Sequence, residues 1–144
     1  MKKTILMLGI AGMFFAGYLS AVKLFSNACA FNESCPYFLG YPACYFGFAM
    51  FALITLFAAL RVFGGTGDKR ALSAILAVSF LGIIFAGYFS LAELPVLFEQ
   101  GLSFYFFGLP TCVLGLIFYV LIFALSLWEY LAQKTDDVAA GGIL

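Results

Sequence analysis

The sequence predicts an all-α membrane protein with four transmembrane helices, and three observations lead to this fold class. The chain of 144 residues is 65% hydrophobic and 10% charged, whereas soluble domains are about half apolar and a quarter charged. Four apolar runs reach the roughly 20 residues that a helix needs to cross a bilayer. Two short phrases recur at similar spacing, which predicts a bundle of two tandem helix-loop-helix repeats.

Each predicted helix covers about 22 residues, or about 33 Å at the rise of an α-helix, which crosses a bilayer with modest tilt. The predicted ranges are 4–25, 42–63, 71–92 and 110–131. The first run follows two lysines and resembles a signal peptide. We expect it to stay in the mature protein, because part of it recurs in the third run. Polar and then small residues at 133–144 predict a flexible tail.

The internal repeat rests on two pairs of matching segments. Residues 15–20 read FAGYLS and residues 85–90 read FAGYFS, at an offset of 70. The phrase Gly-x-Pro-x-Cys-x-x-Gly begins at Gly40 and again at Gly108, at an offset of 68. Each half crosses the membrane twice, so a pseudo-two-fold axis along the membrane normal should relate the halves. We therefore predict one domain over 1–144, with repeats at about 4–63 and 71–131.

Basic residues in the short connections predict the orientation. The connections at 26–41 and 93–109 carry no lysine or arginine, so we expect them on the external side. Lys23, near the outer end of the first helix, can extend its ammonium to the interface or lie beside an anionic or quinone-like headgroup. The other six basic residues fall on one side, which we expect to be cytoplasmic together with both termini: Lys2, Lys3, Arg61, Lys69, Arg70 and Lys134.

The composition excludes several classes of chemistry. The chain has no histidine, which removes the commonest metal ligand and the usual general base at neutral pH. No Cys-x-x-Cys pair is present to begin a zinc site, so we expect no metal. The chain has zero net charge and no basic run. We therefore expect the lipid bilayer as its surroundings and no nucleic-acid partner.

All four cysteines fall on the predicted external side, where disulfides form and persist. Cys29 and Cys35 lie in the first external connection, with five residues between them. One interpretation is a structural disulfide that stiffens this loop. Another is an exchangeable pair that passes electrons to or from a soluble partner. Unpaired thiols, or a different pairing such as Cys35 with Cys44, are further alternatives.

Cys44 and Cys112 form the second group of candidate residues. Pro42 and Pro110 suit the first position of a helix, where the missing N–H costs nothing, so each cysteine falls in a first turn. Unpaired backbone N–H groups and the positive end of the helix dipole point there, which is a typical setting of reactive cysteines. The pseudo-two-fold axis places the two at the same depth. They are either a redox pair or two small apolar residues without chemistry.

Aromatic side chains gather at the same outer level. An interfacial aromatic belt explains most of them, and a flat apolar pocket for a quinone ring is the alternative. We select Tyr41, Tyr45 and Phe107, together with Lys23, as candidate cofactor-binding residues. The aromatic residues at this level are Tyr37, Phe38, Tyr41, Tyr45, Phe46, Phe104, Tyr105, Phe106 and Phe107.

Residues 12–60 resemble the first half of the vitamin K epoxide reductase family, in its prokaryotic disulfide-forming branch. The resemblance rests on AGYLSAVKL at 16–24, the loop cysteines, and FLGYP at 38–42 opening a helix with Gly47. It implies a four-helix bundle in a prokaryotic plasma membrane that binds a quinone near the outer surface. It also implies two cysteine pairs: a loop pair that exchanges with a thioredoxin-like protein, and a membrane-proximal pair that reduces the quinone.

The chain departs from that family at the membrane-proximal pair. The family has Cys-x-x-Cys at the outer end of its last core helix, whereas the fourth run here begins GLPTC with Cys112 alone. The second half instead resembles a copy of the first half. The quinone-facing pair is therefore either absent or rebuilt from Cys44 and Cys112.

Three functional hypotheses follow from these observations. The first is a quinone-dependent thiol–disulfide oxidoreductase with Cys29, Cys35, Cys44 and Cys112 as its catalytic residues. The second is a non-catalytic subunit with a structural loop disulfide, which packs against a membrane-protein partner. A small transporter is disfavoured, because we see no charge in the helix centres. The small residues that would supply close-packing faces for the second hypothesis are Gly9, Gly12, Gly17, Gly82 and Gly87.

Overall fold

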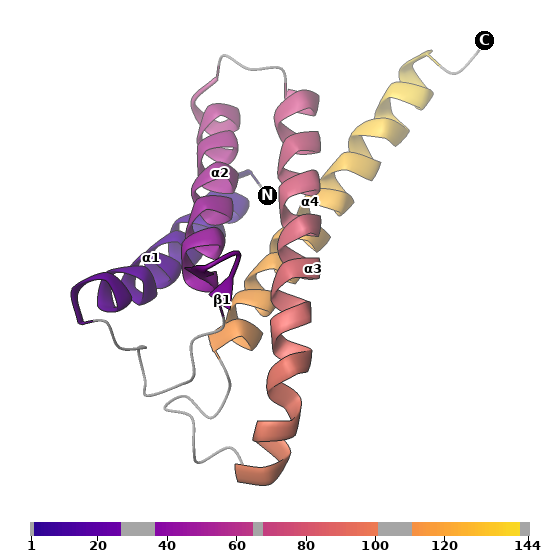
Figure 1. The fold of residues 1–144 in the computed structure, drawn as a ribbon. Coiled ribbons are helices and arrows are strands. Elements are labelled where there is room, and N and C mark those ends of the chain that lie inside the picture. The colour runs from indigo at the N-terminus through magenta and orange to yellow at the C-terminus, as the bar shows by residue number, and fades with distance from the viewer. Residues whose placement is uncertain (1, 27–36, 65–67, 101–110, 142–144) are drawn as a thin grey trace.

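The computed structural model describes residues 2–26, 37–64, 68–100 and 111–141. These residues form four long helices, α1 (Lys2–Ser26), α2 (Ala43–Phe63), α3 (Asp68–Gln100) and α4 (Thr111–Gly141), and one small hairpin (Figure 1). Each of the four helices contains a segment long and apolar enough to cross a membrane. The structure therefore confirms the predicted all-α class, and the chain is a multi-pass membrane protein.

Two helices extend beyond their predicted ends. We expected the third helix to end near residue 92, before Glu93 and Pro95, but α3 continues to Gln100 with Pro95 inside it. A proline within a helix removes one backbone hydrogen bond without necessarily ending the helix. We also expected a flexible tail from residue 133, but α4 continues to Gly141. Its last turns are tied to the start of α3, where Asp68 accepts a hydrogen bond from Gln133.

A hairpin precedes α2, which the sequence interpretation did not foresee. Strand β1 (Tyr37–Phe38) pairs antiparallel with β2 (Tyr41–Pro42) across Leu39 and Gly40. Both turn residues have positive φ, 52° at Leu39 and 85° at Gly40, as a type I′ turn requires. Pro42 consequently lies at the N-cap, with ψ of 137°, and the first helical residue is Ala43. The expectation that Pro42 is the first helical residue is therefore wrong by one position.

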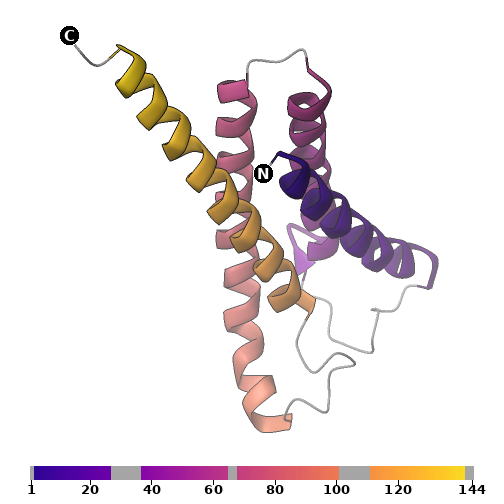
Figure 2. The ribbon, with the colours of Figure 1, turned by 180° about the vertical axis from the view of Figure 1, so that it is seen from behind.

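The four helices pack in a closed order. Helix α1 packs along α2, α3 packs along α4, α2 packs on α3, and α1 also contacts α4. In both views, α1 and α4 are inclined to the central α2 and α3 (Figures 1 and 2). Helices α1 and α3 end at the edge where α2 and α4 begin. We call this edge the cysteine end, and the opposite edge, where α2 ends and α3 begins, the Arg61 end.

The centre of the bundle repeats one packing contact twice. A Cβ atom on Gly12 of α1 would lie 2.4 Å from the Phe51 ring of α2, and one on Gly82 of α3 would lie 2.4 Å from the Tyr119 ring of α4. The glycines are 70 residues apart and the rings 68 apart, which are the two offsets of the sequence repeat. In each half, a glycine therefore makes room for the ring of the neighbouring helix.

The two rings then meet each other between the halves. Phe51 and Tyr119 stack with ring centroids 4.3 Å apart and planes 10° apart. Other core residues occur in pairs at the same offsets. Both members are buried in each of these pairs: Ile5 with Ile75, Ala16 with Ala86, and Ile54 with Ile122. Equivalent faces of the two halves thus form one core, with α2 and α4 meeting at the stacked rings.

Candidate functional site

Cys44 and Cys112 occupy equivalent places at the cysteine end. Each is the second residue of its helix, α2 or α4, and each is partly buried. Within the described part of the chain, both carry thiols and neither is in a disulfide. Cys29, Cys35 and Phe107, which we also selected from the sequence, lie outside the described residues. The predicted disulfide pairings therefore stay predictions.

The stacked rings set the depth of the two cysteines. Cys44 precedes Phe51 by seven residues, and Cys112 precedes Tyr119 by seven residues. At 1.5 Å per residue, each cysteine lies about 10 Å along its helix from the ring pair. The Tyr119 hydroxyl also donates a hydrogen bond to the Gly47 carbonyl, at 3.1 Å. This bond ties α4 to α2 one turn from Cys44.

Lys23 lies near one of these thiols. It occupies the last turn of α1, where the negative end of the helix dipole stabilises a cation. Its ammonium lies within electrostatic range of Cys44 at the start of α2. The structure therefore brings two of the selected residues, Lys23 and Cys44, to the same part of the cysteine end.

The selected tyrosines differ in exposure. Tyr41, in strand β2, is 62% exposed, whereas Tyr45 is partly buried in the first turn of α2. The turn at Leu39 and Gly40 reverses the chain, so that β2 pairs with β1 before α2 begins. This pairing fixes the position of Tyr41 in β2. Tyr45 is next to Cys44 in sequence and in the same helical turn.

An aromatic cluster between α2 and α3 lies near the same end, and sequence reasoning missed most of it. Phe46 of α2 contacts Phe85 of α3 at 5.9 Å between ring centroids. Phe85 contacts Phe89 edge-on at 5.0 Å, and Phe89 contacts Tyr88 at 5.2 Å. A signal was present in the repeated FAGYFS segment, because residues three and four apart share one face of a helix.

The Arg61 end holds a buried ion-pair network that sequence reasoning also missed. The Arg61 side chain is only 1% exposed, and its guanidinium lies 2.6 Å from Glu129 of α4 and 3.0 Å from Asp68 of α3. A buried charge is tolerated only when it is paired and hydrogen-bonded. The sequence interpretation treated Arg61 only as a marker of orientation and did not consider Glu129.

Asp68 connects this network to all four helices. Besides Arg61 of α2, its carboxylate binds the ammonium of Lys2 of α1 at 2.9 Å and accepts a hydrogen bond from Gln133 of α4. A signal for the network existed in the repeat, since Arg61 and Glu129 are 68 residues apart. Equivalent positions therefore carry opposite charges and meet each other, as Phe51 and Tyr119 do.

The two ends differ in the chemistry that they can support. The charged residues Arg61, Asp68 and Glu129 at the Arg61 end pair with one another, whereas the cysteine end carries thiols and aromatic rings. Within residues 2–26, 37–64, 68–100 and 111–141, no group of three or more acidic or cysteine side chains is placed to hold a metal ion.

Comparison with known proteins adds nothing to the description of this site, which rests on the residues of the chain. No family model, no curated protein and no solved structure matches the chain.

Proposed function

We propose that the protein is a membrane thiol–disulfide oxidoreductase that passes electrons from an extracytoplasmic thioredoxin-like partner to a quinone. One observation carries the proposal: Cys44 and Cys112 occupy the same position of equivalent helices, seven residues from the rings at which those helices meet. In this proposal they form the membrane-level pair. Cys29 and Cys35 form the loop pair.

The proposed cycle moves two electrons and two protons. Two thiols of the partner become a disulfide, while the Cys29–Cys35 disulfide is reduced to two thiols. Thiol–disulfide exchange then restores the loop disulfide and reduces the Cys44–Cys112 disulfide. The quinone accepts two electrons and two protons from Cys44 and Cys112, becomes a quinol, and leaves the disulfide re-formed. Formation of that disulfide requires the two Cα atoms to come within about 7 Å.

Groups near Cys44 favour a quinone at the same end. The ammonium of Lys23 can donate a hydrogen bond to a quinone oxygen, whose negative charge grows during reduction. Tyr41, Tyr45 and Phe107 remain the candidate ring contacts from the sequence. The cluster around Phe46, Phe85 and Phe89 adds aromatic rings near the same end. Phe89 is buried, so the partly exposed Phe46 and Phe85 are the rings that could contact a flat apolar ligand.

The orientation is part of the proposal. Six of the seven lysine and arginine residues lie outside the cysteine end; Lys23 is the exception. This distribution favours a cytoplasmic Arg61 end, with both termini on that side. The cysteine end then faces the outside of a prokaryotic plasma membrane, where a disulfide-exchange partner operates.

The alternative of a non-catalytic subunit loses part of its support, since of its five glycines only Gly87 has no described atom within 4 Å of an added Cβ. Its close-packing faces rested on glycines, and a Cβ atom on Gly9, Gly12 or Gly82 would lie within 3.0 Å of a residue in the chain's own helices. These glycines are therefore used for packing inside the bundle.

The function is tested in proteoliposomes that contain a quinone and receive a dithiol donor. We expect the wild-type protein to reduce the quinone, and Cys44→Ser and Cys112→Ser each to abolish turnover, because one thiol cannot form the disulfide. Thr135→Ala, in the exposed last turns of α4, is the control and should retain wild-type turnover. Unchanged turnover in both cysteine variants would contradict the assigned pair.

A double variant, Cys29→Ser with Cys35→Ser, separates the two cysteine pairs. It should stop oxidation of a protein partner yet still reduce quinone from a small dithiol that reaches Cys44 and Cys112 directly. If the double variant only lowers the thermal unfolding temperature and leaves partner oxidation unchanged, the loop disulfide is structural.

A further inference from the structure

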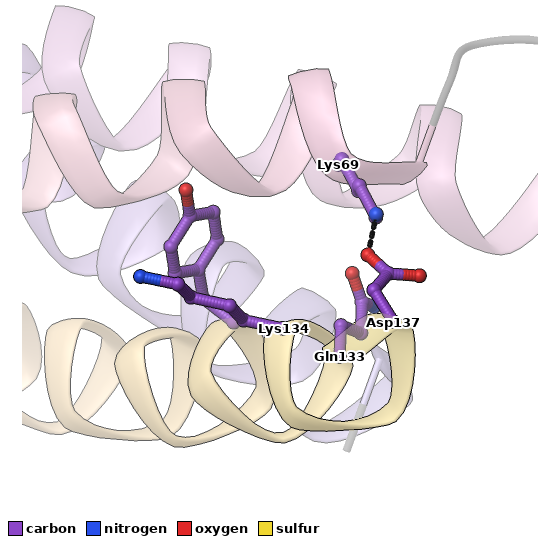
Figure 3. Close-up of a pocket in the computed structure, with 5 residues that line it drawn as sticks. Lys69, Gln133, Lys134 and Asp137 are labelled. Atoms are coloured by element: carbon purple, nitrogen blue, oxygen red, sulfur yellow. Dashed lines mark hydrogen bonds and ion pairs between the residues drawn. The ribbon is translucent and has the colours of Figure 1, made fainter. Parts of the chain in front are cut away.

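A cavity of about 180 Å³ lies at the Arg61 end, between the first turn of α3 and the last turns of α4 (Figure 3). It is separate from the thiols and aromatic rings of the cysteine end. Helix α4 supplies four of its five lining residues and α3 supplies one. The lining residues are Lys69, Tyr130, Gln133, Lys134 and Asp137.

The lining carries both signs of charge. Lys69 of α3 pairs with Asp137 of α4 at one side of the cavity, and Lys134 extends away from that pair (Figure 3). Lys134 makes no ion pair with any residue in the described part of the chain. The cavity therefore presents Lys134, a cation without an ion pair in the described part of the chain, on one side and the Lys69–Asp137 pair on the other.

The cavity also contains a hydrogen-bond acceptor without a donor. The Nε2 atom of Gln133 donates to Asp68. Its Oε1 atom is buried and accepts no hydrogen bond from the described residues. A buried acceptor left without a donor costs free energy. A ligand that brings an N–H group to this atom would remove that cost.

Two aromatic side chains place the cavity near the level of lipid headgroups. Trp128 is 68% exposed and Tyr130 is 38% exposed, and both aromatic types are enriched at membrane–water interfaces. The apolar part of α4 ends nearby at Leu131, and the sequence then turns polar with Gln133 and Lys134. The cavity thus lies where the helix leaves the hydrocarbon region.

We propose that this cavity binds the headgroup of a zwitterionic phospholipid of the phosphoethanolamine class. The phosphodiester would pair with the Lys134 ammonium. The lipid ammonium would donate to Gln133 Oε1 and to the Asp137 carboxylate, which it would share with Lys69. The headgroup therefore matches the order of charges in the cavity and supplies the missing donor. A phosphocholine headgroup has the same charges but no N–H group, so it satisfies only part of the site.

The proposal is tested by native mass spectrometry of the full chain in detergent, with one lipid added at a time. The lipids share their acyl chains and carry phosphoethanolamine, phosphocholine or phosphoglycerol headgroups. We expect the first to be retained at least about tenfold more strongly than the second, because phosphocholine can make neither N–H hydrogen bond and the loss of one such bond already corresponds to about tenfold. Lys134→Gln should weaken its retention about tenfold, and Lys134→Arg should restore it.

Lys3→Gln is the matched control, because Lys3 is another exposed lysine of the same end and does not line the cavity. It should retain the lipid as the wild-type protein does. Circular dichroism confirms that each variant is folded before its lipid is counted. Equal retention of the three lipids, or equal losses in Lys134→Gln and Lys3→Gln, would overturn the proposal. Preference for phosphoglycerol would also overturn it, by showing attraction to a net negative charge alone.

Soluble phosphoethanolamine, added in competition, distinguishes a lipid from a free headgroup. Displacement of the lipid only at a large excess supports the lipid as ligand, because the acyl chains then contribute to binding. Displacement at equal concentration would overturn the lipid assignment and make a soluble phosphate compound the ligand.

Discussion

At the scale of single residues, burial decides what an ion pair contributes. Arg61 and Glu129 are 2.6 Å apart, with side chains 1% and 14% exposed. Lys69 and Asp137 also pair, but their side chains are 61% and 56% exposed. Removing one partner of a buried pair leaves an uncompensated charge in a medium of low dielectric constant. Water and salt screen an exposed pair, which therefore contributes little.

This contrast predicts unequal effects of two matched substitutions. Arg61→Met should lower the free energy of unfolding by about 3–5 kcal/mol, because Glu129 and Asp68 lose a buried counter-charge. Lys69→Met should change it by at most about 1 kcal/mol. Reversible unfolding in mixed micelles, followed by the fluorescence of Trp128, measures both. Similar effects of the two substitutions would contradict the assignment of Arg61 to a buried network.

At the scale of elements, close contact of α3 with α4 depends on Gly82. The Tyr119 ring lies where a side chain at Gly82 would be, with 2.4 Å to its Cδ1 atom. The ring has little room to move, because its other neighbours include the stacked Phe51 ring and the Gly47 carbonyl. Gly87, on the same helix, has no described atom within 4 Å of its added Cβ.

These surroundings predict opposite effects of the same substitution on one helix. Gly82→Ala should lower the free energy of unfolding by about 1–3 kcal/mol, because the ring must shift in a filled core. Gly87→Ala should raise it by up to about 1 kcal/mol, because alanine favours the helix more than glycine does. The same micelle titration measures both variants. Equal effects would mean that the contact with Tyr119 does not limit the approach of the helices.

At the scale of the whole molecule, the two halves meet through complementary residues at equivalent positions. Phe51 meets Tyr119, and Arg61 meets Glu129, in both cases across an offset of 68. Asp68 adds contacts to α1, α2 and α4. The Arg61 end is therefore joined across all four helices, while Cys44 and Cys112 lie beyond the stacked rings at the other end.

If the two halves are equivalent at this contact, the buried charges of Arg61 and Glu129 can be exchanged. Arg61→Glu alone places a third carboxylate beside Glu129 and Asp68, and we expect it to prevent stable folding or to cost more than Arg61→Met. Arg61→Glu combined with Glu129→Arg should recover part of that loss, with a coupling energy of about 1–3 kcal/mol. Asp68 remains within reach of the exchanged arginine, since Gln133, one turn from residue 129, already contacts it.

Yield of folded protein and the micelle titration measure this exchange. Glu129→Arg alone is the second single variant that this double-mutant cycle requires. Additive effects of the two substitutions would contradict direct pairing of residues 61 and 129.

The sequence by itself determined the four spans, their tandem repeat and the equivalence of Cys44 and Cys112. These features follow from composition and from spacing along one chain, because a helix that crosses a bilayer must be long, apolar and internally hydrogen-bonded. The sequence also selected Lys23 and Cys44, which the structure brings to one part of the bundle.

Only the tertiary structure decided which residues of the two halves touch. In the sequence, Arg61 is a charge at the end of the second predicted helix, and its burial against Glu129 and Asp68 depends on how α2, α3 and α4 pack. The continuation of α4 past residue 133 depends on α3 in the same way, since Gln133 finds its partner there. Pairings between distant segments arise from packing in three dimensions, and local patterns along the chain do not contain them.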